Sequence, residues 1–317
     1  MRFALSSRTT FRAMSTASHI IDTQSYTNKC IEAYRKIVSA NPKIDADHSV
    51  LHVITVANTG RAALTEFLKT RTYLPEELLT SIYIPDDVVL RTDTACLLHE
   101  VGDTKFADEK SKPKEELISE ILDEVFICYP SYTPEMKNDI INMIDYCTSS
   151  KWGDRMPENV KIYQLIPRWA DRLEATGIIG IARALLYGYS KITKNYPLCE
   201  PTDPYPTTLE ELVNFASSER YLAYSKGKPS TGTFGHFFDK LLHINGINVP
   251  ISYLKNSLNN GQTIIQQFVL DFTNKNNKKY NIDWVCDNLD PVKYSAEILQ
   301  LREMQKHLRA LNNPKWA

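Results

Sequence analysis

Apolar residues recur every three or four positions along most of this 317-residue chain, and no segment shows the strict alternation of a half-buried strand. Positions three and four apart lie on one face of an α-helix, so each such segment can bury one side against its neighbours. The chain has no internal repeat and no heptad run. The sequence therefore predicts an all-α fold in which helices share one core.

Prolines mark where several of these helices begin and end. Pro113 and Pro134 stand at first-turn positions, where a missing N–H is tolerated, and the pair Asn41–Pro42 ends the first helix. Three glycines in the range 158–188, which holds one or two helices, indicate close packing between helices. The predicted helices cover residues 24–40, 46–69, 86–99, 113–127, 134–147, 158–188, 234–243, 261–280 and 291–311.

Two stretches depart from this pattern. Residues 190–232 contain five prolines and form a long excursion, predicted to be a lid or binding loop with a short hairpin, or else a disordered decoration. Residues 1–22 are rich in Ser, Thr and Arg and carry no acid before Asp22, which is typical of a disordered tail or a mitochondrial transit peptide. Residues 23–317 are predicted to form a single domain.

Composition argues against several classes of protein. A net charge of −1 offers no electrostatic attraction for a nucleic acid polymer. No apolar run approaches the roughly 18 residues that a membrane span needs. None of the six cysteines belongs to a CxxC pair, so we expect reduced structural thiols rather than a cysteine zinc site. These features predict a protein of the cytoplasm or the mitochondrial matrix that is not secreted and handles small molecules.

Three segments carry side chains that suit a metal ion. His99 and Glu100 follow the apolar run 94–98, while His52 and Asp171 lie on other helical segments. Metal centres of helical proteins are built from facing helices that each supply one or two ligands. Imidazole and carboxylate together suit Mn, Fe, Co, Ni or Zn, whereas Mg prefers more oxygen ligands. Spacing alone leaves open the alternative that these histidines are packed in the core.

Four fragments, which together span roughly residues 45–245, carry a resemblance to a known family: His48–Val56, Leu97–Phe106, Ala170–Arg183 and His236–Leu242. They resemble the HD-domain phosphohydrolases and, more narrowly, the bacterial HD-domain nucleotide pyrophosphohydrolases, and Ala170–Arg183 is the most similar of the four. The resemblance implies an HD-domain helical bundle with extra C-terminal helices, a divalent metal, and hydrolysis of phosphate or phosphoanhydride bonds.

The resemblance implies that His52, His99, Glu100 and Asp171 bind the metal, with Mn expected and Co, Ni, Fe, Zn or Mg as alternatives. The chain departs from the family at one ligand, because the family has Asp where Glu100 stands. Glu keeps the charge and adds about 1.5 Å of reach. Glu100 can therefore bind the metal directly, bind through a water, or leave a weak site and a weak or inactive enzyme; we favour retained binding.

Four further residues near these fragments are candidates for catalysis and substrate binding. Asp103 is the catalytic candidate, because it lies three residues after Glu100. From there it could orient a histidine or position the attacking water. Capping of the next segment is its alternative role. Lys105, Arg183 and Lys240 are candidate phosphate ligands. The alternative for each of these is a solvated or bridging side chain.

The predicted reaction is metal-dependent hydrolysis of a nucleoside or deoxynucleoside triphosphate to the monophosphate and pyrophosphate. One alternative is a nucleoside monophosphate phosphatase. Another is a regulatory protein that binds metal or nucleotide and has lost turnover because of Glu100. The expected partner is a small nucleotide, not a nucleic acid polymer or a membrane, and homo-oligomer formation is left open.

Overall fold

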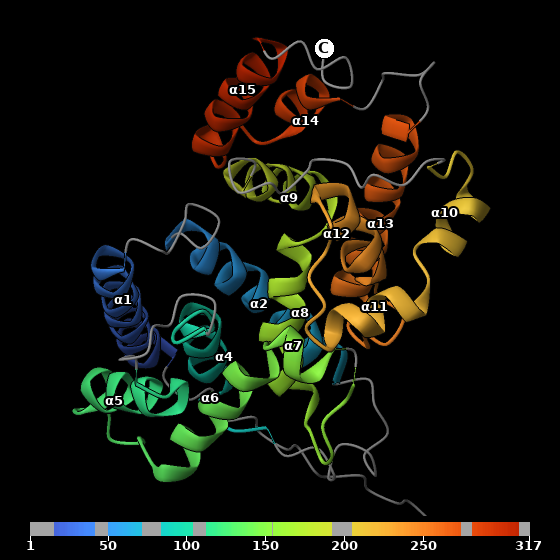
Figure 1. Cartoon of the computed structure of the whole chain (residues 1–317). Coiled ribbons are helices and arrows are strands. Elements are labelled where there is room, and N and C mark those ends of the chain that lie inside the picture. Colours follow the sequence, from blue (N-terminus) through green and yellow to red (C-terminus); the bar gives the residue numbers. More distant parts are fainter. Residues whose placement is uncertain are drawn as a thin grey trace, which may run out of the picture.

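The computed structural model describes residues 16–41, 50–71, 84–103, 112–153, 155–191, 205–273 and 281–310, without the side chains of 16–23, 71, 149–150, 191 and 273. All regular secondary structure in these ranges is helical, which confirms the all-α prediction (Figure 1). The elements are α1 (Thr16–Ala40), α2 (Val50–Arg71), α4 (Val88–Leu98), α5 (Lys114–Phe126), α6 (Pro134–Tyr146), α7 (Ser149–Trp152), η2 (Ile162–Leu165), α8 (Ile166–Glu174), α9 (Gly177–Lys191), α10 (Leu209–Phe215), α11 (Ser218–Ser225), α12 (Thr233–Asp239), η4 (Leu241–His243), α13 (Ser252–Thr273), α14 (Ile282–Asn288) and α15 (Ser295–Ala310).

Helix α4 is the centre of the first half of the chain. Every residue of α4 except Val89 is buried, because α1, α2, α6 and α8 all pack against it. Apolar side chains such as Leu90, Leu97 and Leu98 account for much of this burial. A short helix that is buried on all sides holds its end in a fixed position. The residues that follow Leu98 are therefore placed firmly in the interior.

Helix α9 organises the second half in the same way. It packs against α12, α13, α14 and α15, while α8 joins it to the first group of helices (Figure 1). The turn between α8 and α9 arises at Thr176 and Gly177, since the φ of Gly177 is +63° and Thr176 N–H donates to Leu173 O. The range 158–188 thus holds two α-helices with a short 3₁₀ helix, η2, ahead of them.

The structure differs from the predicted elements in several places. The described part of the excursion, residues 205–232, contains α10 and α11 instead of a hairpin, because Thr208 and Ser217 act as helix N-caps. Helix α14 was not predicted, although Asn281 caps its start by accepting from Trp284 N–H. Helix α1 begins at Thr16, so residues 16–22 of the predicted tail lie in the helix. A transit peptide at residues 1–22 stays one of the two predicted alternatives.

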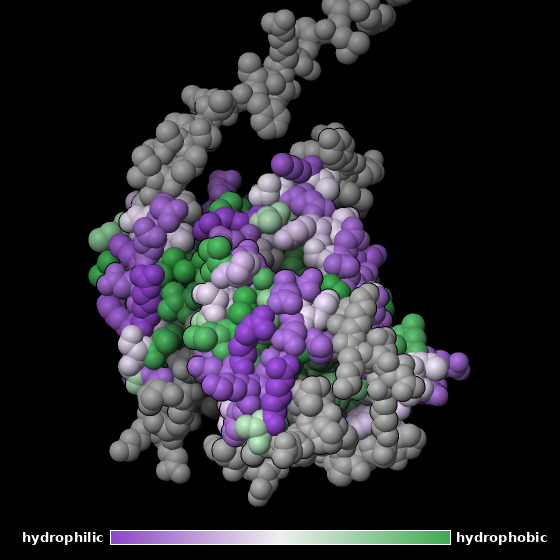
Figure 2. Space-filling view, turned by 90° about the horizontal axis from the view of Figure 1, so that it is seen from above, coloured by the Kyte–Doolittle hydropathy of each residue, from purple (hydrophilic) through white to green (hydrophobic). Residues whose placement is uncertain are grey.

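The face shown in Figure 2 mixes hydrophilic and apolar side chains. Exposed large apolar residues include Leu209 and Val213 of α10. Among the described helices, none combines the length and the apolar composition that a bilayer crossing needs.

We expect Gly188→Ala to destabilise the fold by about 1–3 kcal/mol, the usual effect of overpacking a core. The reason is that a Cβ on Gly188, in α9, would overlap the side chain of Thr233 at the start of α12. Urea unfolding measures the change. Thr233→Gly in the same chain removes the clash, so the double variant should lose less stability than the sum of the two single variants. Strict additivity would contradict the proposed contact.

Candidate metal centre

The candidate metal centre lies at the C-terminal end of α4. The chain leaves the helix at Leu98 and turns through His99 and Glu100, both of which are buried. His99 Nδ1 lies 2.8 Å from Cys96 O. When Nδ1 donates its proton to this carbonyl, the ring orientation is fixed and Nε2 keeps its lone pair. The end of α4 thus presents an imidazole nitrogen that can bind a metal.

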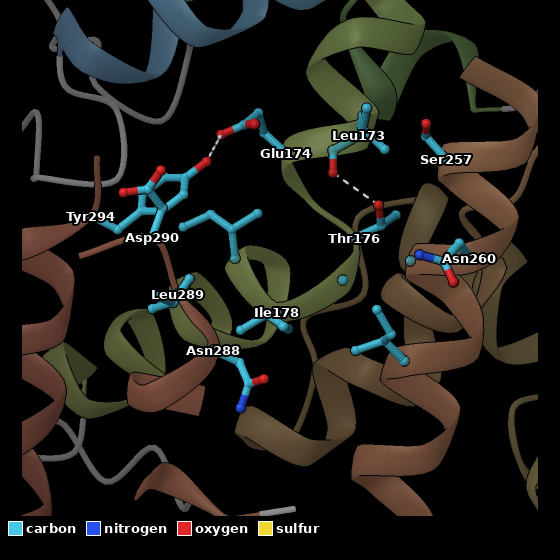
Figure 3. A pocket seen from close by; sticks show the side chains of 14 residues that line it. Leu173, Glu174, Thr176, Ile178, Ser257, Asn260, Asn288, Leu289, Asp290 and Tyr294 are labelled. Atoms are coloured by element: carbon cyan, nitrogen blue, oxygen red, sulfur yellow. Dashed lines mark hydrogen bonds between the residues drawn. The ribbon is translucent and has the colours of Figure 1, made fainter. Parts of the chain in front are cut away.

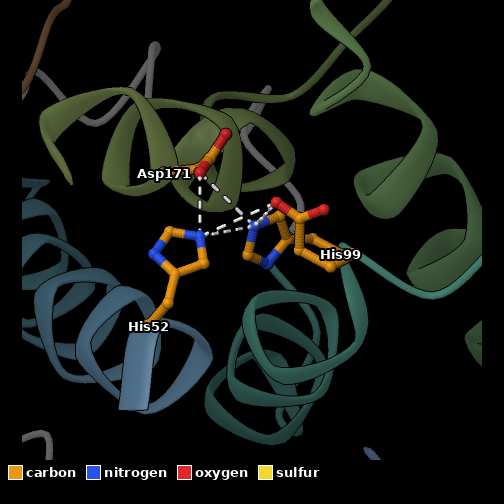
Figure 4. A group of neighbouring side chains, drawn as sticks. His52, His99 and Asp171 are labelled. Carbon is orange, nitrogen blue, oxygen red and sulfur yellow. Dashed lines mark hydrogen bonds and ion pairs between the residues drawn. The ribbon is translucent and has the colours of Figure 1, made fainter. Parts of the chain in front are cut away.

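His52 from α2 and Asp171 from α8 meet His99 and Glu100 at this point (Figure 4). His52 Nε2 lies 3.3 Å from His99 Nε2, and Asp171 Oδ1 lies 3.4 Å and 3.3 Å from these two nitrogens. Glu100 Oε1 lies 3.8 Å from His52 Nε2 and 3.5 Å from His99 Nε2. The structure therefore brings together the four residues expected to bind metal, and their role as ligands stays a prediction.

The separations between these atoms suit a shared metal ion. Hydrogen-bonded nitrogen and oxygen atoms lie about 2.7–3.2 Å apart. Ligand atoms bound at about 2.0–2.2 Å to one tetrahedral ion are instead about 3.3–3.6 Å apart. The nearest separations here run from 3.3 to 3.8 Å, and all four atoms lie within 4.8 Å of one another. Two imidazoles and two carboxylates form a donor set that first-row divalent metals accept.

The charges of the four side chains depend on one another. Burial and the nearby Arg183 guanidinium lower the pKa of His52 to about 3, although Asp171 opposes them. Burial also disfavours the charged form of His99, but Asp171 and Glu100 outweigh it and raise the pKa of His99 to about 10. Although burial disfavours its charge, the two histidines hold the pKa of Asp171 well below its usual range. A proton on His99 thus lies where a metal cation would lie.

We expect metal binding near pH 7 to release about one proton, because a histidine must be neutral to bind metal and the pKa of metal-free His99 is raised to about 10. Calorimetric titration of Mn²⁺ in buffers with different ionisation enthalpies measures this number. Because its pKa is raised, protonated His99 also stabilises the metal-free fold. This contribution is fully present below pH 6.5 and is lost as the pH rises through about 10. Binding that releases no proton would contradict the assignment.

Arg183, predicted as a phosphate ligand, lies beside the centre. Its Nη1 atom is 3.4 Å from His52 Nδ1 and 3.4 Å from the main-chain oxygen of Glu174. Arg183 belongs to α9 and Glu174 ends α8, so the turn between these helices brings the guanidinium back toward α2. The structure thus places a cation where it could contact a phosphate group near His52.

Lys114, which begins α5, was not among the residues predicted from the sequence. Its Nζ lies 3.4 Å from His99 O and 3.5 Å from Thr148 Oγ1. The turn at Gly102 has a φ of +67° and packs so closely that a Cβ there would lie 2.9 Å from Lys114 Cα. No carboxylate of the described residues forms an ion pair with Lys114, whereas Lys112 pairs with Glu120. No sequence motif marks Lys114, so only the fold reveals its position.

The remaining candidates are placed only in part. The main-chain N–H of Asp103 donates to Glu100 O at 3.3 Å, which keeps Asp103 within the turn that follows the centre. Lys105 and His48 lie outside the described residues. Lys240 is the C-cap residue that follows α12, and this helix packs on α9, α11 and η4. Catalysis by Asp103 and substrate binding by Lys105, Arg183 and Lys240 stay predictions.

Comparison with known proteins gives one sequence relative and several partial structural likenesses. The uncharacterized protein L803 of Acanthamoeba polyphaga mimivirus is 34% identical over 162 residues, which cover 49% of this chain and 64% of the relative's length. The chain thus matches less than two thirds of that protein. No protein-family model matches the chain.

Two solved structures are similar over 78% of this chain. YpgQ of Bacillus subtilis, solved in complex with ADP, is 16% identical, with a TM-score of 0.46 and 93% of its own chain covered. A protein of Lactobacillus plantarum is 18% identical, with a TM-score of 0.47 and 92% of its chain covered. Similarity at this level of identity and TM-score does not indicate a function for this chain. Support for a function comes instead from the four side chains at the centre.

Proposed function

We propose that this chain is a divalent-metal-dependent phosphohydrolase of the HD-domain type that acts on nucleotides. The observation that supports it is the cluster of His52, His99, Glu100 and Asp171, whose donor atoms come from three helical segments that are far apart in sequence. Core histidines alone do not require two carboxylates beside them, and buried carboxylates are unfavourable without a cation. The four sequence fragments that resemble nucleotide pyrophosphohydrolases narrow the substrate to nucleotides.

The geometry of the cluster supports the roles proposed for its four residues and for Arg183. His99, held through its Nδ1 by Cys96 O, and His52 supply the two nitrogen ligands, while Asp171 and Glu100 supply negative charge. A divalent ion in this position would lower the pKa of a coordinated water and neutralise phosphate charge. Arg183 lies on the His52 side of the cluster and would bind a phosphate oxygen there. Asp103 is the candidate that orients the attacking water.

We propose hydrolysis of a nucleoside triphosphate at the α-phosphorus, which yields the monophosphate and pyrophosphate. A panel of nucleoside mono-, di- and triphosphates with Mn, Co, Ni and Mg tests this by the product that leaves. Pyrophosphate from triphosphates supports the proposal. Orthophosphate from monophosphates would instead support a phosphatase, and no product with any metal would contradict an enzymatic role.

Lys114→Met should lower kcat/KM for the nucleotide about 10- to 100-fold, the range for losing one charged hydrogen bond. The half-buried ammonium of Lys114 lies next to the centre and forms no ion pair with a carboxylate of the described residues, so a substrate phosphate can serve as its counterion. Steady-state kinetics and Mn²⁺ affinity are measured together, and metal affinity should stay within about threefold.

The matched control for this change is Lys112→Met, because Lys112 lies two residues earlier, is exposed and pairs with Glu120. It should leave kinetics unchanged. If Lys114→Met lowers thermal stability but not kcat/KM, Lys114 is only a structural partner of the α4 terminus.

A further inference from the structure

A cavity of about 300 Å³, largely open to solvent, is lined by the end of α8 and the turn between α8 and α9 (Figure 3). Its other walls come from α13 and from the segment that joins α14 to α15. The volume is at the lower end of the range for small-molecule sites. It therefore has room for a group about the size of a sugar with part of a base.

The cavity and the metal centre share one short helix. Glu174 lines the cavity and follows Asp171 by three residues, which is a rise of about 4.5 Å along α8. One guanidinium nitrogen, Nη1 of Arg183, contacts both His52 Nδ1 and Glu174 O. Arg183 thus contacts both a predicted metal ligand and the main chain of a residue that lines the cavity. A ligand that reached from the metal centre to the cavity would have to pass Arg183.

The lining favours a neutral polar group over a phosphate. Leu173, Ile178 and Leu289 supply apolar wall, while Asn260 and Asn288 supply amide groups at the solvent-exposed rim. The carboxylates of Glu174 and Asp290 would repel a second anion. Uncharged hydroxyls and ring nitrogens, in contrast, can bond to carboxylates and amides. The chemistry is that of a nucleoside site rather than of an anion site.

Contacts between residues hold the walls of the cavity in place. Tyr294 OH donates to Glu174 Oε2 at 3.4 Å, and Lys293 Nζ lies 3.9 Å from Glu174 Oε1. Gly261 of α13 packs on the α8–α9 turn so closely that a Cβ there would lie 2.5 Å from Thr176 Oγ1. Walls held by such contacts need little rearrangement when a ligand binds, which reduces the entropic cost of binding.

We infer that this cavity binds the nucleoside portion of the substrate, with Glu174 and Tyr294 facing the sugar hydroxyls and Asn260 facing the base. The inference rests on the proposed function, since it presumes that the phosphates lie at the metal centre. It assigns nucleotide selectivity to the α8–α9 turn and α13, away from the four residues that would hold the metal.

Comparing a nucleoside triphosphate with inorganic tripolyphosphate distinguishes nucleoside binding in the cavity from hydrolysis at the metal centre. Tripolyphosphate has phosphoanhydride bonds but no nucleoside. Asn260→Ala should raise KM for nucleoside triphosphates at least fivefold and leave KM for tripolyphosphate within twofold. Ile178→Trp, which fills the cavity, should raise the nucleotide KM more than tenfold with the same small effect on tripolyphosphate. Asn256→Ala is the matched control, since Asn256 is exposed one turn earlier on α13 and does not line the cavity.

A second measurement does not depend on turnover. Calorimetric titration of the metal-loaded protein with AMP, GMP, CMP and UMP should show at least one that binds, and Asn260→Ala and Ile178→Trp should raise its Kd at least fivefold. The inference would be overturned if the wild type bound none of the four monophosphates. It would also be overturned if the Ile178→Trp variant bound all of them as tightly as the wild type does. If wild type binds a monophosphate at the cavity but hydrolyses neither polyphosphate nor nucleotide, the proposed function fails while the nucleoside site stands.

Discussion

Asp171→Asn should weaken Mn²⁺ binding by more than about 100-fold and lower kcat/KM by at least as much. The reason is that losing even a partner that only orients a metal ligand lowers metal affinity or activity about 10- to 100-fold. Asp171 Oδ1 lies 3.4 Å from His52 Nε2 and 3.3 Å from His99 Nε2, so it is central to the cluster. The neighbouring histidines keep its pKa well below the usual range, so the group is a carboxylate at neutral pH. Asparagine keeps the shape and removes the charge.

Electron paramagnetic resonance of free Mn²⁺ measures the binding, and circular dichroism verifies that the variant folds. Asp145→Asn is the matched control, because Asp145 belongs to α6 and pairs with Lys151 at 2.7 Å. It should retain metal affinity and activity, since exposed ion pairs contribute little. If Asp171→Asn binds Mn²⁺ as tightly as wild type, the four side chains are not a metal site.

Glu100→Gln is the second substitution expected to have a large effect, because it should lower Mn²⁺ affinity by more than about tenfold. Glu100 Oε1 lies 3.5 Å from His99 Nε2 and 3.8 Å from His52 Nε2, so the longer side chain already reaches the cluster. This geometry supports direct binding over a site weakened by the extra methylene. Glu100→Asp should therefore withdraw the oxygen by about 1.5 Å and weaken metal binding rather than improve it.

The comparison of wild type, Glu100→Asp and Glu100→Gln also separates the enzyme from the alternative of an inactive regulatory protein. Metal content after purification and turnover are measured for all three. The order wild type, then Glu100→Asp, then Glu100→Gln is expected for both quantities. A wild type without metal, together with a Glu100→Asp variant that gains metal and turnover, would mean that the natural chain has lost its activity.

The sequence was sufficient to predict the helical class from local periodicity, and the cluster from the resemblance to a known family. Helical periodicity places His52, His99 and Asp171 on separate helices. The family resemblance then predicts that these residues meet at one metal ion. The break between α8 and α9 was harder to predict, since an apolar pattern runs through it and only the positive φ of Gly177 reveals the turn.

Residues that reach the centre from distant segments could not be predicted in the same way. Lys114 reaches it because the turn at Gly102 brings the start of α5 against His99. The cavity likewise depends on α13 packing against the α8–α9 turn at Gly261, a contact between residues far apart in sequence. Tertiary packing of this kind leaves no periodic signal in the chain.

The most direct test of the central claim is hydrolysis of a nucleoside triphosphate by the Mn²⁺-loaded protein in ¹⁸O-enriched water, with mass spectrometry of both products. Attack of water on the α-phosphorus places one ¹⁸O atom in the nucleoside monophosphate and none in pyrophosphate, and Asp171→Asn should abolish the reaction. Label in the pyrophosphate or in orthophosphate would contradict the proposed reaction. Turnover that persists after complete removal of metal would contradict the proposed role of the centre.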